Sequence, residues 1–151
     1  MGLLGNPSTW AKVRLLTRLT RRFDRRELGA IYAGGVIGAL ARVGLSEALP
    51  HGVDAWPWAT FVANLVGAAL LGWFVTRLGE RLPPSTYGLP FLGTGLCGAL
   101  TTFSTLQLEL FEMLEGGYVG LAAAYAAATV AGGFACVHFG IVATRRARVL
   151  R

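Results

Sequence analysis

The stretch GTGLCGALTTFST at residues 93–105 sets four hydroxyl side chains around one aromatic ring, directly after a run of spaced glycines. It stands in the middle of an apolar segment that is long enough to cross a bilayer. Hydrocarbon offers no water to satisfy such groups, so they must face protein, a cavity or an ion. A membrane protein that places so many small donors at mid-depth is expected to handle something polar there.

The composition is that of an integral membrane protein. Of the 151 residues, 54% are hydrophobic and 15% are charged, and the mean hydropathy is +0.53. These charges are too few to cover a soluble surface. Four apolar segments, each sufficient to span a bilayer, are separated by connections too short to hold a domain. They cover residues 28–49, 58–78, 88–113 and 118–144.

We therefore predict an all-α membrane protein with four transmembrane helices. A basic amphipathic tail is expected at 1–27, the four-helix membrane domain at 28–144 and a short basic tail at 145–151. The first tail could lie on an anionic membrane surface or be solvated. Nucleic acid is not an expected partner, because membrane topology explains the basic pI of about 10.2 more simply.

The basic residues fall in three clusters that four spans would bring to one face of the membrane. Seven precede the first span, Arg77 and Arg81 lie at the second connection, and four follow the last span. By the positive-inside bias, both termini are cytoplasmic and the protein is a multi-pass protein of the cell membrane. Arg42 is the exception, and within the first span it is expected to snorkel or to find a partner. Gly34 and Gly38, in the same span, are interpreted as a site of close helix packing.

The third span is expected to break near its middle. Its glycines are poor interior helix residues, and its hydroxyls can bond to the backbone in place of the helical ladder. Ser104 and Gln107 form a possible capping box that would restart the helix. Such a break exposes carbonyls at one end and N–H groups at the other, which suit a cation and an anion. The alternative is a helix that only bends.

Polar side chains also recur in the second and fourth spans. Thr60 and Asn64 stand four residues apart on one helix face, as do Tyr125 and Thr129. Each pair can line a narrow polar track, or can make an ordinary hydrogen bond between helices. At the outward end of the third span, Glu109 and two further glutamates are interpreted as a solvated rim.

At these residues the chain resembles the small fluoride-exporting channels called Fluc or CrcB. The similarity covers most of residues 29–143, and the stretch 98–105 is its most specific part. The resemblance implies a four-helix subunit in a dimer whose partner is inverted, with fluoride pores around a central, structural sodium ion. It places these residues at the fluoride pore: Arg42 (vestibule), Thr60, Asn64 (donor), Phe103 (ring edges), Ser104, Tyr125 and Thr129. It assigns sodium to the backbone carbonyls of Gly98 and Thr101.

One position departs from the family pattern. Leu106 stands where the family has a second phenylalanine, so this subunit cannot supply a pair of rings. Because an inverted homodimer needs the same chain to insert both ways, the one-sided basic residues favour a paralogous partner subunit. A non-conducting structural partner subunit stays open as an alternative function.

Two other classes of protein fit less well. A small multidrug exporter needs a carboxylate within its first span, where Glu27 and Glu47 lie only at the ends. A serine hydrolase built on Ser104 and His138 would lack an orienting acid and a nucleophile elbow, so we expect no enzyme.

Overall fold

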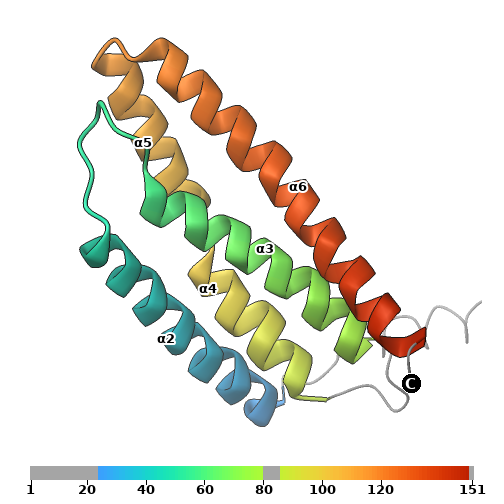
Figure 1. Ribbon diagram of the computed structural model, residues 1–151. Coiled ribbons are helices and arrows are strands. Elements are labelled where there is room, and N and C mark those ends of the chain that lie inside the picture. Colours follow the sequence, from blue (N-terminus) through green and yellow to red (C-terminus); the bar gives the residue numbers. More distant parts are fainter. Residues whose placement is uncertain (1–23, 80–85, 150–151) are drawn as a thin grey trace, which may run out of the picture.

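The computed structural model describes residues 24–79 and 86–149, and all regular elements within them are helices (Figure 1). The elements are α2 (Arg25–Ala48), α3 (Trp58–Gly79), the π-helix η1 (Pro90–Cys97), α4 (Gly98–Leu100), α5 (Phe103–Glu115) and α6 (Val119–Val149). The basic amphipathic tail predicted at 1–27 lies outside the described residues up to position 23.

Three of these helices are long and apolar enough to cross a membrane: Arg25–Ala48, Trp58–Gly79 and Val119–Ala147. The chain is therefore an integral membrane protein, as its composition predicts. The α3 helix begins at the predicted residue, whereas α6 continues five residues past the predicted end at 144. At a rise of about 1.5 Å per residue, α6 is longer than the roughly 30 Å of bilayer hydrocarbon, so it must tilt or protrude.

The third apolar segment is built from shorter pieces. The chain runs through η1 and α4 to Leu100, passes through extended backbone at Thr101 (φ −76°, ψ 150°) and Thr102 (φ −145°, ψ 125°), and resumes as α5. The cap of α5 is Thr102, whose hydroxyl accepts the Thr105 N–H at 3.2 Å. The capping residue predicted at Ser104 is therefore wrong by two positions, because Thr102 is the last residue outside helical geometry.

Close packing by glycine sets how the elements lie against one another. A Cβ atom added at Gly34 would overlap the carbonyl oxygen of Phe91, and one at Gly38 would overlap that of Leu96. The α2 helix thus lies directly against η1, which confirms the packing role predicted for these two glycines. The α3 helix packs along α6, and α5 lies beside the first half of α6 (Figure 1).

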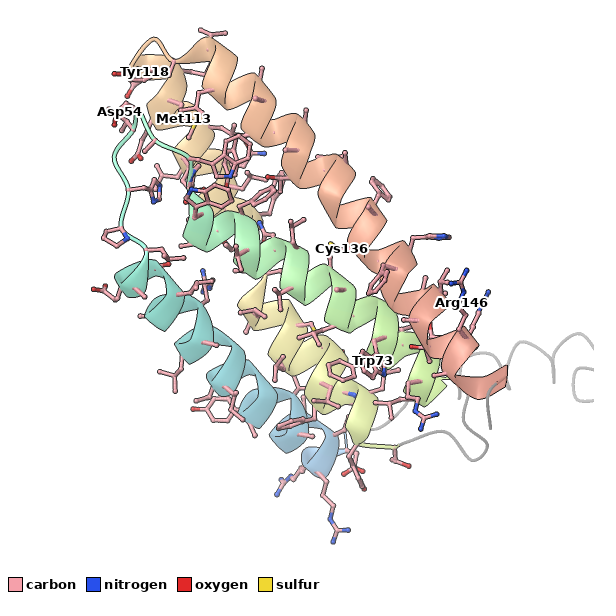
Figure 2. All side chains as sticks on the ribbon, viewed as in Figure 1. Asp54, Trp73, Met113, Tyr118, Cys136 and Arg146 are labelled. Atoms are coloured by element: carbon pink, nitrogen blue, oxygen red, sulfur yellow. The ribbon has the colours of Figure 1, made fainter. Side chains whose placement is uncertain are left out.

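The two ends of the bundle differ in charge. The first residues of α2, the last of α3 and the last of α6 lie at one end, which gathers Arg25, Arg26, Arg77, Arg145 and Arg146 (Figures 1 and 2). The connection at residues 49–57 and the turn between α5 and α6 lie at the other end. The clustering of basic residues predicted from the sequence is therefore present in the described helices.

Candidate functional site

Asn64 of α3 holds the backbone between α4 and α5. Its Nδ2 donates to the carbonyl of Thr102 at 3.1 Å, and its Oδ1 accepts the Thr102 N–H at 2.8 Å. Both backbone groups of Thr102 have left the helical ladder, and one amide side chain satisfies them. An amide carries two N–H donors, so Asn64 keeps a second one for another acceptor.

A glycine allows α3 to approach the extended residues between α4 and α5. A Cβ atom added at Gly67, less than one turn after Asn64, would overlap the side-chain methyl of Thr101. The glycine that follows the polar pair in the second span therefore has a packing function. It brings the Asn64 amide within reach of the extended residues.

The four hydroxyls around Phe103 are tied to one another and to the backbone. Thr102 Oγ1 donates to Thr105 Oγ1 at 2.9 Å and lies 3.3 Å from Ser104 Oγ. Since the single proton of Thr102 is used toward Thr105, Ser104 donates to Thr102. Thr101 donates to the carbonyl of Cys97 at 2.9 Å. This network fixes the conformation of the interruption without any charged group.

An open groove of about 420 Å³ runs beside the interruption, between α3, the start of α5 and α6. Its lining comprises Asn64, Ala68, Thr101, Thr102, Phe103, Leu106, Thr129, Val130, Gly133, Phe134 and Val137. Thr129 is only 8% exposed, and its hydroxyl has no hydrogen-bond partner among the described residues. Phe103 is 71% exposed. The groove thus combines an amide donor, a free buried hydroxyl and the surface of an aromatic ring.

Thr60 and Tyr125 meet at a buried carboxylate. The Thr60 hydroxyl donates to Glu109 Oε1 at 2.6 Å, and the Tyr125 hydroxyl donates to Oε2 at 2.7 Å. Trp56 and Phe61 surround the tyrosine ring, with centroids 5.4 and 6.4 Å away. Two of the three hydroxyls predicted to lie on polar tracks, those of Thr60 and Tyr125, are therefore committed to one acid.

The prediction of a solvated rim is wrong for Glu109, which is 7% exposed, whereas Glu112 and Glu115 are exposed. The sequence held a signal for this difference. Glu109 lies three residues after Leu106 and four before Met113, and both are buried, so it shares the inward face of α5. His51, in the connection before α3, reaches the same acid, with Nε2 3.7 Å from Oε1.

Two further predicted site residues, Arg42 and Gly98, do not line the groove. Arg42 is half-buried in α2, and its Nε has no hydrogen-bond partner among the described residues. Gly98 is exposed, and a Cβ atom added to it would meet nothing within 4 Å. It lies at the start of α4, and Thr101 follows the end of that helix, so both residues flank the interruption on its carbonyl side.

Comparison with known proteins identifies the family of this chain. Residues 29–141 match the family described as CrcB-like protein, Camphor Resistance (CrcB). This chain belongs to the CrcB family. The matched region contains every candidate residue from Arg42 to Thr129.

Several relatives in the CrcB family are close in sequence. The protein called fluoride-specific ion channel FluC 1 of Mycobacterium bovis is 54% identical over 128 residues, which cover 85% of this chain and 97% of the relative. FluC 2 of Nocardia farcinica is 41% identical over 122 residues, 81% of this chain and 87% of the relative. FluC of Marinobacter nauticus is 45% identical over 93 residues, 62% of this chain and 74% of the relative.

Proposed function

We propose that this chain is a subunit of a fluoride-selective channel that lets fluoride leave the cell passively. The observation that carries the proposal is the groove where Asn64, Phe103 and the unpartnered hydroxyl of Thr129 come together from three separate segments. The names of the relatives, fluoride-specific ion channels, agree with it.

The groove suits the chemistry of a small anion. A bare ion in a low dielectric costs tens of kcal/mol, so donors must replace its water. The spare N–H of Asn64 and the hydroxyl of Thr129 are neutral donors, and the edge of the Phe103 ring is electropositive. Neutral donors bind the ion without trapping it, as conduction requires.

No catalytic step or energy source is needed for this function. A membrane potential that is negative inside drives an anion outward, at about 2.3 kcal/mol per charge and 100 mV. Fluoride that enters as hydrogen fluoride and ionises inside would leave by this path. The chain therefore acts as a channel and not as an enzyme.

The groove is incomplete in one copy, which supports assembly with an inverted partner. Phe103 and the apolar wall of α6, including Phe134, are exposed on the single chain. An antiparallel dimer would cover these surfaces and enclose the pathway. In this assembly η1, α4 and α5 act together as the third spanning segment, and the extended residues Thr101 and Thr102 lie near mid-depth.

A structural sodium ion belongs to the same proposal. The open space beside Gly98 would let an ion approach the carbonyls of Gly98 and Thr101. Unwound backbone carbonyls are ligands that suit Na⁺ in membrane proteins. Two carbonyls leave the oxygen shell unfilled, so the partner's equivalent groups would supply the rest.

Orientation and partner follow from the charge distribution. The basic end of the bundle faces the cytoplasm, so both termini are cytoplasmic. Because this bias opposes insertion in both directions, the partner is a paralogous subunit of opposite orientation. Leu106 lies in the groove where a second ring would complete the donor set. It favours one competing role, in which this chain is a non-conducting partner that supports the pore of the other subunit.

Fluoride efflux from liposomes, measured with a fluoride-selective electrode, tests the proposal. The vesicles contain this chain alone or with a paralogous subunit from the same organism. We expect Phe103→Leu to lower efflux about tenfold or more, since about 1.4 kcal/mol at a barrier is a factor of ten. Phe139→Leu is the matched control, because Phe139 is also 71% exposed on the single chain but does not line the groove.

Two results separate the candidate functions. If Phe103→Leu and Asn64→Leu leave efflux unchanged while the paralogue's own ring variant abolishes it, this chain is the non-conducting partner. If vesicles with every paralogue retain their fluoride, the channel proposal is wrong.

A further inference from the structure

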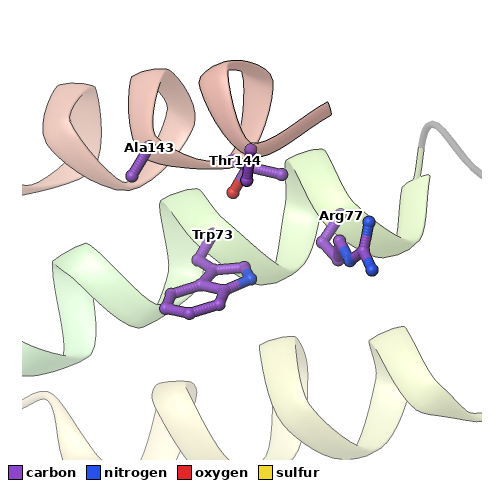
Figure 3. A pocket seen from close by; sticks show the side chains of 5 residues that line it. Trp73, Arg77, Ala143 and Thr144 are labelled. Atoms are coloured by element: carbon purple, nitrogen blue, oxygen red, sulfur yellow. The ribbon is translucent and has the colours of Figure 1, made fainter. Parts of the chain in front are cut away.

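A second pocket lies between α3 and α6 at the basic end of the bundle, and it shares no residue with the groove. It has a volume of about 260 Å³ and is lined by Trp73 and Arg77 of α3 and by Ala143, Thr144 and Ala147 of α6 (Figure 3). The fluoride pathway proposed above makes no use of it.

The pocket follows from the way the two helices meet. A Cβ atom added at Gly72 would overlap the carbonyl of Val137, and one at Gly140 would overlap that of Ala69. The helices are therefore in backbone contact there. One turn later on α6, the small side chains of Ala143 and Ala147 leave space opposite Trp73 and Arg77.

Among the described residues, the free donors that border this space are the guanidinium of Arg77 and the indole of Trp73. Trp73 and Arg77 are four residues apart, so they project from the same face of α3. Figure 3 shows the indole nitrogen on the side of the ring that is nearer Arg77. Within residues 24–79 and 86–149, no carboxylate lies within ion-pairing distance of the Arg77 guanidinium. The Thr144 hydroxyl is already used, because it donates to the Gly140 carbonyl at 2.9 Å.

This donor set selects an anion with several oxygens. A guanidinium presents N–H groups in a planar fork that matches two oxygens of a phosphate, and the indole N–H can reach a third. Among the residues that the structure describes, no acidic side chain lines the pocket.

We propose that this pocket binds the phosphate of an anionic phospholipid headgroup. The pocket lies between two helices that are long and apolar enough to cross a membrane, and its residues Thr144 and Ala147 flank Arg145 and Arg146 in the sequence of α6. Trp73 is exposed beside it, and tryptophan is typical of the membrane interface. A lipid can place its headgroup on Arg77 and its acyl chains along the apolar outer surface of the same helices.

Thermal unfolding of the full-length protein in detergent tests this proposal, with phosphatidylglycerol, phosphatidylcholine or inorganic phosphate added. We expect phosphatidylglycerol to raise the unfolding midpoint more than the other two. The apparent affinity for it should fall about tenfold or more in Arg77→Gln, because a charge-assisted pair of hydrogen bonds is lost. It should fall less in Trp73→Phe, which removes only the indole donor.

Two further variants test whether the lipid binds in the pocket itself. Ala147→Leu fills the pocket without changing charge, and it should weaken binding even if Arg77→Gln does not fold. Arg146→Gln removes an equal charge from the same end outside the pocket, and it should bind as the wild type does. Equal losses in Arg77→Gln and Arg146→Gln would overturn the proposal in favour of diffuse attraction.

The choice of ligand has its own controls. An equal midpoint shift with inorganic phosphate would indicate a free-phosphate site, and an equal shift with phosphatidylcholine would remove the requirement for negative charge. Either result would overturn a site for anionic lipid. Fluoride efflux does not enter any of these measurements, so they stand apart from the proposed channel function.

Discussion

Two side chains, Asn64 and Glu109, organise the hydrogen bonds around the interruption between α4 and α5. Asn64 satisfies both backbone groups of Thr102, and Glu109 gathers the hydroxyls of Thr60 and Tyr125. No lysine or arginine among the described residues lies within ion-pairing distance of Glu109. The described interior of the bundle is therefore organised by neutral donors around one buried acid, which is compatible with the proposed anion pathway.

The buried acid permits a stability prediction at this scale. We expect Tyr125→Phe and Glu109→Gln each to lower the free energy of unfolding by about 1–3 kcal/mol, because each leaves a buried polar group without a hydrogen-bond partner. In the double variant the two losses should overlap by about 1 kcal/mol or more, since both break the same contact. Unfolding in mixed micelles measures all three values.

Ser46→Ala is the control for this cycle. Ser46 is exposed and donates to the carbonyl of Arg42 in its own helix, so its loss should cost little. Strict additivity of Tyr125→Phe and Glu109→Gln would show that the 2.7 Å contact does not stabilise the protein.

At the level of elements, α2 and η1 depend on the absence of side chains where they touch. We expect Gly34→Ala to destabilise the protein by about 1–3 kcal/mol, because the added methyl overlaps the Phe91 carbonyl and the backbones must separate. Gly44→Ala is the matched control on the same helix, where an added Cβ meets nothing within 4 Å. It should be neutral or should stabilise by up to about 1 kcal/mol. Equal effects would mean that the helices are not in contact.

Features that depend on neighbouring residues in the sequence were predicted better than features that depend on contacts between helices. The bounds of α3 follow from hydropathy and length, and those bounds were predicted to within one residue. The cap at Thr102 was missed because the capping-box pattern fits Ser104 with Gln107 and does not fit Thr102, which is followed three residues later by Thr105. The burial of Glu109 had a local signal in its spacing to Leu106 and Met113, whereas its partners, Thr60 and Tyr125, come from distant helices and could not be predicted.

The same difference applies to the groove: its residues could be predicted one by one, but their arrangement depends on how the helices pack. Asn64, Phe103 and Thr129 were predicted individually, and the structure brings them to one groove. Their part in conduction stays a prediction. The pocket beside Arg77 had no sequence signal, because it arises from where α3 and α6 separate after Gly72 and Gly140.

For the whole molecule, the gathering of arginines at one end predicts a single orientation in the membrane. In a background with Cys97→Ala and Cys136→Ala, a membrane-impermeant thiol reagent added outside intact cells should label Glu115→Cys and spare Arg146→Cys. Disrupting the membrane should make both positions reactive, which is the control for accessibility. Labelling of both positions to the same extent from outside would indicate dual topology and a homodimer.

The position of Phe103 on the outer surface of the single chain has a consequence for biogenesis. In the proposed dimer each copy supplies only one wall of the fluoride pathway, so before pairing the acyl chains of the bilayer would cover the other side. An orphan subunit would therefore be electrically silent, and the bilayer would stay sealed until a companion docks. Synthesis can then run ahead of assembly without dissipating the ion gradients of the cell.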